Sequence, residues 1–345
     1  MPIETPGAIA ESPWRLPRAA WIQVLKRVFM MAGFHNLNLL AGGVAFFTFL
    51  AITPLIASTV MIYGLIGDVS MVERQMNALV EVLPSDAATL IEAQLLAVVT
   101  TSSGVTGLAL LIALAFAIYG GMRAASGLIK ALNVINEEKE TRGIIKITAR
   151  AALLTLCAIG IALVGIVSGS VFTWLQTQTS ILIGSRVESL FSLLTWGFAI
   201  ALGSLGFAVI MRFGPDRARA QWRWLTPGAV LATLLFIAVS FGFSLYVAYI
   251  SDYNATYGSL SAIVVFLMWL FLSAYAILLG ALVNAEAERQ TLQDSTIGPE
   301  APLGERGAVL ADSTVLRGHA LAVQEKKRRR EMERLARKSA RNSNN

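Results

Sequence analysis

Six long runs of apolar residues, each free of aspartate and glutamate, constrain this chain more than any other feature of its sequence. The runs cover residues 39–66, 105–131, 151–175, 190–211, 225–250 and 259–284. Crossing about 30 Å of hydrocarbon takes roughly 20 helical residues, so each run is long enough to span a bilayer. Outer-membrane strands would instead alternate polar and apolar residues over about 10 positions. The sequence therefore predicts an all-α, polytopic membrane protein with six transmembrane helices.

Lysine and arginine residues collect on alternate sides of these runs. Of the 28 Lys and Arg residues, all but Arg74 and Arg186 fall in the N-terminus, in the connections around 123–150 and 212–223, or in the C-terminal tail. Cytoplasmic loops of membrane proteins carry an excess of Lys and Arg. The pattern predicts a multi-pass protein of the bacterial inner membrane with both termini in the cytoplasm.

Three segments follow from this topology. Residues 1–38 are predicted to be a cytoplasmic N-terminus with an amphipathic interfacial helix, because apolar positions such as Trp21, Val24 and Val28 recur at helical spacing while Lys26 and Arg27 fall on the opposite face. The alternative is a helix docked against the bundle. Residues 39–284 form the transmembrane domain. Residues 285–345 are predicted to be a basic, flexible cytoplasmic tail.

The charge of the C-terminal tail predicts a binding partner. It ends in a cationic segment that begins with residues 326–330. Each cation near anionic lipid is worth about 1 kcal/mol, so anionic headgroups at the cytoplasmic face are the expected ligands beyond the bilayer itself. No aromatic side chain follows Leu310 on which a base could stack, so no specific nucleic acid is expected. A homo-oligomer is compatible with the sequence.

Residue usage argues against several kinds of chemistry. The single cysteine, Cys157, excludes an intrachain disulfide, and the two histidines, His35 and His319, are far apart in sequence. Neither a metal site nor a cofactor is expected. No enzymatic activity is predicted, because metal-dependent phosphodiester cleavage needs clustered carboxylates or histidines and the inner face offers only Glu137, Glu138 and Glu140 on one short loop.

Polar residues at the inner ends of the second and sixth runs predict an inner polar vestibule. Its expected members are Arg123, Lys130, Asn133 and Asn284. Other interpretations stay open: Arg123 is close enough to the interface to extend its guanidinium to water, and Asn133, Asn136 and Asn284 are also suited to capping helices. The vestibule interpretation implies an arginine that binds a phosphate or carboxylate group.

Two further features are candidates for gating or for structure. Pro54 interrupts the hydrogen bonding of the first run and predicts a kink, with Thr53 near enough to satisfy a freed carbonyl. Such a kink serves as a gate in one interpretation and as a purely structural bend in the other. Tyr257, Gly258 and Ser259 are predicted to form the tight outer turn between the fifth and sixth runs, where glycine supplies backbone freedom.

Several short motifs, in the same order along the chain, resemble the YihY/virulence factor BrkB family of bacterial integral membrane proteins, formerly labelled ribonuclease BN-like. They are Ala45-Phe46-Phe47 with Pro54-Leu55, Ala131-Leu132-Asn133, Pro227-Gly228-Ala229, Tyr257-Gly258-Ser259-Leu260, Trp269, Gly280-Ala281 and Asn284-Ala285. The chain departs from the pattern at Ala51, where serine is common, and at Leu282, where glutamate is common. The second departure weakens any mechanism that needs a carboxylate there. The resemblance implies a six-helix inner-membrane protein and does not define an activity.

The sequence is compatible with three functional hypotheses. The leading hypothesis is a transporter-like, channel-like or lipid-handling protein. The six runs contain no aspartate or glutamate that could relay protons across the membrane. A facilitator for a small solute, or a protein that binds an anionic lipid headgroup, therefore fits the sequence better than a proton-coupled transporter. The alternative is a non-catalytic envelope scaffold whose basic tail binds lipid or a partner. The third, a membrane-bound ribonuclease, is disfavoured by the sparse carboxylates and histidines.

Overall fold

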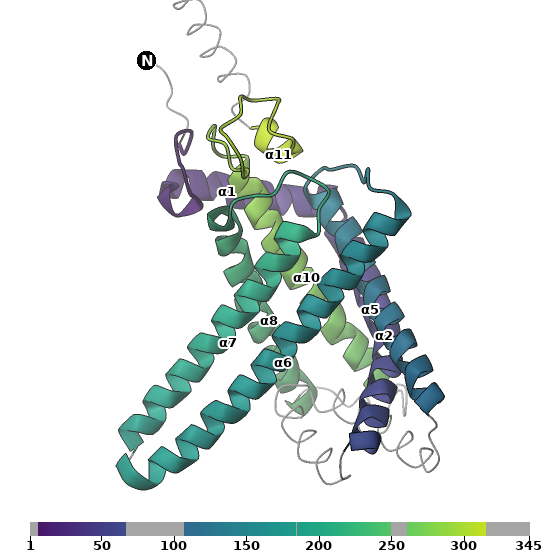
Figure 1. The fold of residues 1–345 in the computed structure, drawn as a ribbon. Helices are drawn as coiled ribbons and strands as arrows, with labels where there is room; N and C mark the ends of the chain where they lie inside the picture. Colours follow the sequence, from purple (N-terminus) through teal and green to yellow (C-terminus); the bar gives the residue numbers. More distant parts are fainter. Residues whose placement is uncertain (1–5, 67–106, 184, 250–260, 315–345) are drawn as a thin grey trace, which may run out of the picture.

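The computed structural model describes residues 6–66, 107–183, 185–249 and 261–314 (Figure 1). Within these ranges the regular structure is helical, apart from one isolated antiparallel bridge between Ala220 and Thr296. The elements are η1 (Pro13–Arg15), α1 (Arg18–Phe34), α2 (Leu37–Ile66), α5 (Gly107–Ile135), α6 (Ile144–Ile183), α7 (Ser185–Phe213), α8 (Trp222–Tyr249), α10 (Ser261–Glu288) and α11 (Val309–Asp312). The all-α prediction is confirmed.

The long helices coincide with the apolar runs. Four helices in the described part of the chain are long and apolar enough to cross a membrane, and they lie in α6, α7, α8 and α10. A fifth follows if α1 and the first half of α2, which meet at a bend of 65°, count together as one span. A multi-pass membrane protein is therefore confirmed. The number six and the side of the termini stay predictions.

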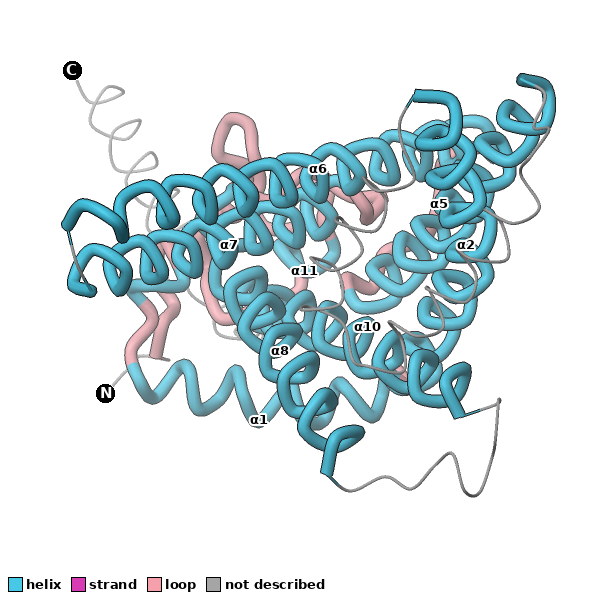
Figure 2. The backbone as a smooth tube through the Cα atoms, turned by 90° about the horizontal axis from the view of Figure 1, so that it is seen from below, coloured by secondary structure: helices cyan, strands magenta, loops and turns pink. Residues whose placement is uncertain are grey.

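The six long helices pack as a ring. Each contacts its neighbours in the order α10, α2, α5, α6, α7, α8 and back to α10 (Figure 2). Among the described residues, α6 packs against α5 and α7, and α7 packs against α6 and α8, with at most marginal contacts elsewhere. Both views show α6 and α7 leaning away from α2 and α5 at one end.

The opposite end of the ring is closed, and we call it the α1 end. There α1 lies across the bundle and packs on α10, and α11 sits nearby (Figure 1). The largest buried cluster gathers apolar side chains from α1, α2, α5, α7, α8 and α10, with Leu132, Leu225 and Leu278 among them. The core of the protein is therefore concentrated on α10 and the helices beside it.

Close approach of α8 and α10 depends on glycine. A Cβ atom added at Gly228 would overlap the carbonyl oxygen of Gly280, and one added at Gly280 would overlap the carbonyl oxygen of Gly228. Small residues let membrane helices approach closely where no hydrophobic force drives them together. A similar contact sets Gly120 of α5 against the backbone of Ala51 in α2. These contacts account for the glycines of two predicted family motifs.

The α6–α7 hairpin is the reverse case. In the most apolar stretches of α6 and α7, only 12% and 11% of the span is buried inside the protein, whereas the value for α10 is 44%. Large apolar side chains are exposed along both helices: Leu153, Leu156, Ile159, Leu163, Val164, Val167 and Val171 on α6, and Leu193, Leu194, Trp196, Phe198 and Leu205 on α7. Apolar side chains in such a position are suited to contact lipid chains rather than water.

The N-terminal helix combines the two predicted alternatives. Ala20, Val24 and Val28 are buried, and α1 packs on α10, so the helix is docked. Phe29 is nevertheless 85% exposed, as an interfacial helix requires. The Arg27 guanidinium, on the face opposite the apolar positions, donates to the Glu286 carboxylate at 2.7 Å.

Two other expectations meet the structure only in part. The described portion of the predicted flexible tail, residues 285–314, is folded against the α1 end, with Leu310 and Ala311 buried. Flexibility is therefore the wrong description for that portion, because polar and apolar contacts hold it. Pro54, the site of the predicted kink, lies inside the continuous helix α2. The side chains of Thr53 and Pro54 are not among those that the structure describes, so the kink or gate stays a prediction. Tyr257, Gly258 and Ser259 lie outside the described residues.

Candidate functional site

Polar side chains that bridge distant segments fix the geometry of the α1 end. The loops at residues 136–143 and 214–221 and the segment 289–308 all meet there, and many of their hydrogen bonds join residues more than 60 positions apart. Buried polar groups are costly unless they are paired, so these contacts specify how the segments sit.

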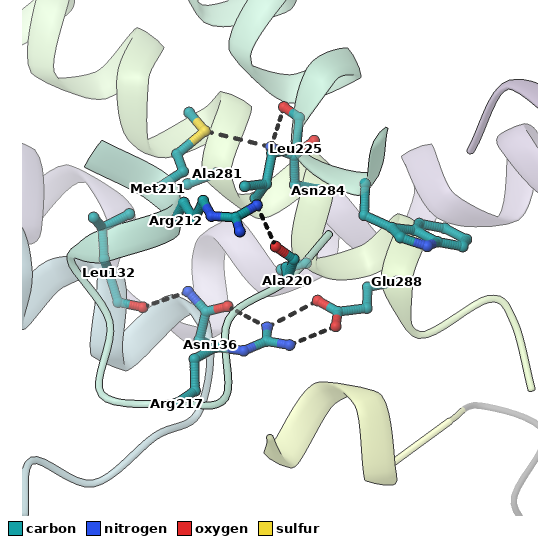
Figure 3. Close-up of a pocket in the computed structure, with 12 residues that line it drawn as sticks. Leu132, Asn136, Met211, Arg212, Arg217, Ala220, Leu225, Ala281, Asn284 and Glu288 are labelled. Carbon is teal, nitrogen blue, oxygen red and sulfur yellow. Dashed lines mark hydrogen bonds and ion pairs between the residues drawn. The ribbon is translucent and has the colours of Figure 1, made fainter. Parts of the chain in front are cut away.

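Arg217 and Glu288 form the most buried ion pair of this end. The two Arg217 terminal nitrogens donate to the two Glu288 carboxylate oxygens at 2.8 and 2.5 Å, and each side chain is 5% exposed (Figure 3). Asn136 accepts a further bond from Arg217, and Ser295 donates to Glu288. Burial disfavours the charge on Arg217, but attraction to Glu288 outweighs it and raises the pKa of Arg217. The pair links α10 to the α7–α8 loop.

A second group ties α1 to the end of α10. The Glu286 carboxylate accepts from Arg27 at 2.7 Å and lies 3.4 Å from Arg289, which in turn pairs with Glu137 at 2.5 Å. Arg27 also donates to Gln290. Because Glu286 is almost completely buried, this chain of charges fixes α1 on the bundle.

A third group holds the loop after α5. Arg142 donates to Glu140 at 2.6 Å, and Asp216 accepts from the backbone and hydroxyl of Thr141. The hydrogen bond from Arg142 lowers the pKa of Glu140. Burial alone would raise the pKa of Asp216, but the bonds from Thr141 and the charge of Arg142 lower it. Asn133 joins the group by donating to Glu140 and accepting from the Asp216 amide.

Arg306 holds the segment after α10 in place. Its guanidinium donates to the backbone carbonyls of Leu292, Gln293, Ala301 and Ala311. One side chain therefore organises the turn of residues 289–314. The amide of Val309 then bonds the Glu138 carboxylate, whose pKa is raised by burial.

The structure does not bring the four predicted vestibule residues into one pocket. Asn284 is buried between helices: it accepts from the amide of Gly228 at 2.7 Å and donates to the carbonyl of Leu225 at 2.9 Å. Asn133 holds the α5–α6 and α7–α8 loops together. Arg123 and Lys130 are exposed, and the Arg123 guanidinium lies 5.6 Å from the ring centre of Phe47. The side chains of Asn133 and Asn284 thus hold neighbouring segments together, and the vestibule stays a prediction.

A small pocket does exist beside Asn284. Its lining includes Asn136, Arg212, Arg217, Trp224 and Glu288, and its cavity volume is about 20 Å³ (Figure 3). One water needs roughly 10 to 15 Å³ of such space, so the pocket admits a ligand of about that size. In the described residues there is no group of three or more His, Cys, Asp or Glu side chains placed to hold a metal.

Sequence reasoning missed an arginine-rich surface where α6, α7 and α8 meet. Arg150 of α6 donates to the carbonyl of Phe213 at the end of α7, and the Arg219 guanidinium lies 5.1 Å from the Phe213 ring centre. Neither arginine forms an ion pair with a carboxylate in the described part of the chain. We call Arg150, Arg219 and Phe213 the arginine rim. The signal was the arginine excess of the connections, which had been used only for orientation.

Fold and surface together define a multi-pass, all-α membrane protein. The virulence factor BrkB family matches residues 28–304, and the chain belongs to that family. The match includes α2 to α10 and most of the folded segment that follows.

Two curated proteins are similar to this chain. The chain is 28% identical over 171 residues to the ribonuclease-like protein YfkH of Bacillus subtilis, covering 49% of this chain and 62% of that protein. It is 27% identical over 269 residues to a UPF0761 membrane protein of Kangiella koreensis, covering 77% and 64%. The chain thus spans a little under two thirds of these relatives. No solved structure matches it.

Proposed function

We propose that this protein is a lipid-handling protein of the bacterial inner membrane, which binds an anionic phospholipid headgroup at the arginine rim with the lipid chains along α6 and α7. The observation that carries the proposal is the position of Arg150 and Arg219. Neither cation forms an ion pair with a carboxylate among the described residues, and both lie at the ends of two helices whose apolar side chains are exposed. Guanidinium groups are well suited to phosphate.

The proposed orientation has six spans and both termini in the cytoplasm. Supporting it, the N-terminal segment lies against the residues that follow α10: Leu292 donates to the carbonyl of Ala8, and Thr291 donates to that of Ala10. The two ends of the folded chain therefore meet on one side of the bundle. The alternation of Lys and Arg along the sequence favours the cytoplasm for that side.

A hydrophilic conduction path is less well supported than lipid binding. The exposed side chains of α6 and α7 are mainly apolar, while the polar groups of the α1 end are paired with one another. A path for a hydrated solute needs polar groups along its length. Exposed apolar helices ending at cations suit an amphiphile instead.

The experiment measures lipid affinity on purified full-length protein. Native mass spectrometry with phosphatidylglycerol should show bound lipid, and the variant R150Q/R219Q should bind it roughly thirtyfold more weakly, at about 1 kcal/mol for each cation. The matched control R123Q removes a cation that lies away from the rim. Equal loss in the control, or full affinity in the double variant, would contradict the proposal.

The scaffold alternative is separated by truncation. Removing residues 315–345 keeps the folded segment that Arg306 organises. We expect that truncated protein to keep its phosphatidylglycerol affinity at the rim. If the truncated protein loses its affinity for phosphatidylglycerol, the lipid site belongs to the tail. That result would support the scaffold hypothesis.

We also expect no ribonuclease activity. The three candidate carboxylates at this end are engaged: Glu137 pairs with Arg289, Glu138 accepts from the Val309 amide and Glu140 pairs with Arg142. Incubating the purified protein with RNA and divalent metal tests the expectation. Cleavage that disappears in E138Q would contradict it.

A further inference from the structure

The pocket beside Asn284 holds an unusual charge. Arg212 is 9% exposed and forms no ion pair with a carboxylate in the described part of the chain. Its one hydrogen bond to the protein there runs from a terminal nitrogen to the carbonyl of Ala220 at 3.0 Å, and its guanidinium lies 4.3 Å from the Trp222 ring centre. A buried cation without a counter-charge is costly, so a partner for it is expected.

Two buried donors along the pocket have no acceptor among the residues that the structure describes. They are the Nε of Arg212 and the indole Nε1 of Trp224, a side chain that is only 1% exposed. Arg212 comes from the end of α7 and Trp224 from the start of α8, so the fold brings them to one cavity from separate helices. Buried donors in native proteins nearly always have partners.

The charges along the pocket favour an anion over a neutral ligand. Two guanidinium groups, those of Arg212 and Arg217, face one carboxylate, that of Glu288. Glu288 is already matched by Arg217 and Ser295, which leaves the charge of Arg212 uncompensated (Figure 3). A water molecule would satisfy a donor but would not neutralise the charge.

We propose that this pocket binds one small monovalent inorganic anion, of the size of chloride, between Arg212 and Trp224. The cavity volume of about 20 Å³ excludes phosphate and lipid headgroups unless side chains move. The anion fixes the end of α7 to the start of α8 beside the close contact of α8 with α10. This site adjoins the arginine rim, because the Arg212 guanidinium lies 5.5 Å from the Phe213 ring centre, but its lining includes none of the three rim residues and the proposal does not depend on the proposed lipid function.

Chloride titration of the full-length protein in detergent tests the proposal. Sodium gluconate replaces sodium chloride at constant ionic strength, and the midpoint of thermal unfolding is followed. The midpoint should rise with chloride to a plateau, as a ligand of the native state requires, and bromide should act alike. A flat response up to physiological salt overturns the proposal.

Variants connect the response to the pocket. W224F keeps an aromatic ring and removes one donor, and it should raise the half-saturating chloride concentration by about tenfold, the equivalent of one hydrogen bond. R212Q should abolish the response. If R212Q does not fold, W224F still decides, with W14F as its control because Trp14 is 68% exposed and lies outside the pocket. An unchanged response in W224F overturns the proposal.

The chloride and lipid proposals fail independently. R150Q/R219Q should keep a saturable chloride response, since neither residue lines the pocket, although the charge of Arg219 acts on Arg212 and its removal should weaken chloride binding. W224F should leave phosphatidylglycerol affinity unchanged. Loss of the chloride response in R150Q/R219Q would show that the anion binds at the rim, and the pocket assignment would be wrong.

Discussion

The α1 end and the α6–α7 hairpin are stabilised in different ways. At the α1 end, charged and amide side chains from five segments pair with one another over a buried core of α10 and its neighbours. The hairpin packs only on the helices beside it and exposes its apolar side chains. Hydropathy identifies both as membrane helices, but packing separates a rigid end from a surface open to lipid.

The largest predicted effect is breaking the buried pair at the α1 end. Replacing Arg217 by Met leaves the Glu288 carboxylate buried without its counter-charge, which should lower the free energy of unfolding by about 3–5 kcal/mol. Thermal unfolding in detergent measures the loss. R15M, which removes an exposed ion pair, should change little. Equal effects for the two variants would mean that the Arg217 pair is not buried in solution.

The α8–α10 contact should come next. G280A places a methyl group against the backbone of Gly228, which should cost about 1–3 kcal/mol unless the helices separate. G160A on α6 is the matched control, since a Cβ added there meets nothing within 4 Å. The monodispersity after detergent extraction and the midpoint of thermal unfolding are measured for both variants. A stable G280A with a destabilised G160A would reverse the comparison.

Acid should weaken the α1 end before the hairpin. The lowered pKa values of Glu140 and Asp216 mean that their stabilising contribution is present above their ordinary values of 4.5 and 3.8 and is lost as the pH falls through the folded pKa values. Glu138 has the opposite sign, because its raised pKa favours the protonated form. The midpoint of thermal unfolding, measured between pH 3 and 7, tests this prediction. The midpoint of E140Q should fall less steeply at acid pH than that of the unmodified protein. An unchanged slope in E140Q would refute the stabilising role of the Glu140 carboxylate.

The smallest effect is expected on the hairpin. L163A truncates a side chain that is 56% exposed and should change stability by less than about 0.5 kcal/mol. L278A, at a fully buried position of α10, should cost about 2–5 kcal/mol. Comparing the two unfolding midpoints sharpens the contrast between regions. A large loss in L163A would indicate that another surface covers α6.

The sequence predicted the architecture better than the site. The long apolar runs without acidic residues were sufficient to predict membrane helices, but the contact between Gly228 and Gly280 was not predicted from their motifs. Hydropathy cannot indicate which helix faces are packed, so the exposed hairpin was not foreseen. Ion pairs such as Arg27–Glu286 were missed because their partners are 259 residues apart.

Vestibule residues show why the site was harder to predict. Asn284 was predicted to be a polar residue of the vestibule, but its three partners come from α7 and α8. Position near a membrane surface does not determine whether a side chain caps, packs or binds. Arg212 and Trp224 meet only because the α7–α8 loop folds back, which no local pattern reveals.

A cryo-EM structure of the full-length protein in phosphatidylglycerol nanodiscs tests the central claim most directly. The account predicts headgroup density beside Phe213, with phosphate oxygens about 2.7–3.2 Å from guanidinium nitrogens of both Arg150 and Arg219. Chain density should continue along the exposed side chains of α6 or α7. An empty rim, with Arg150 and Arg219 paired instead to carboxylates of the protein, would contradict it.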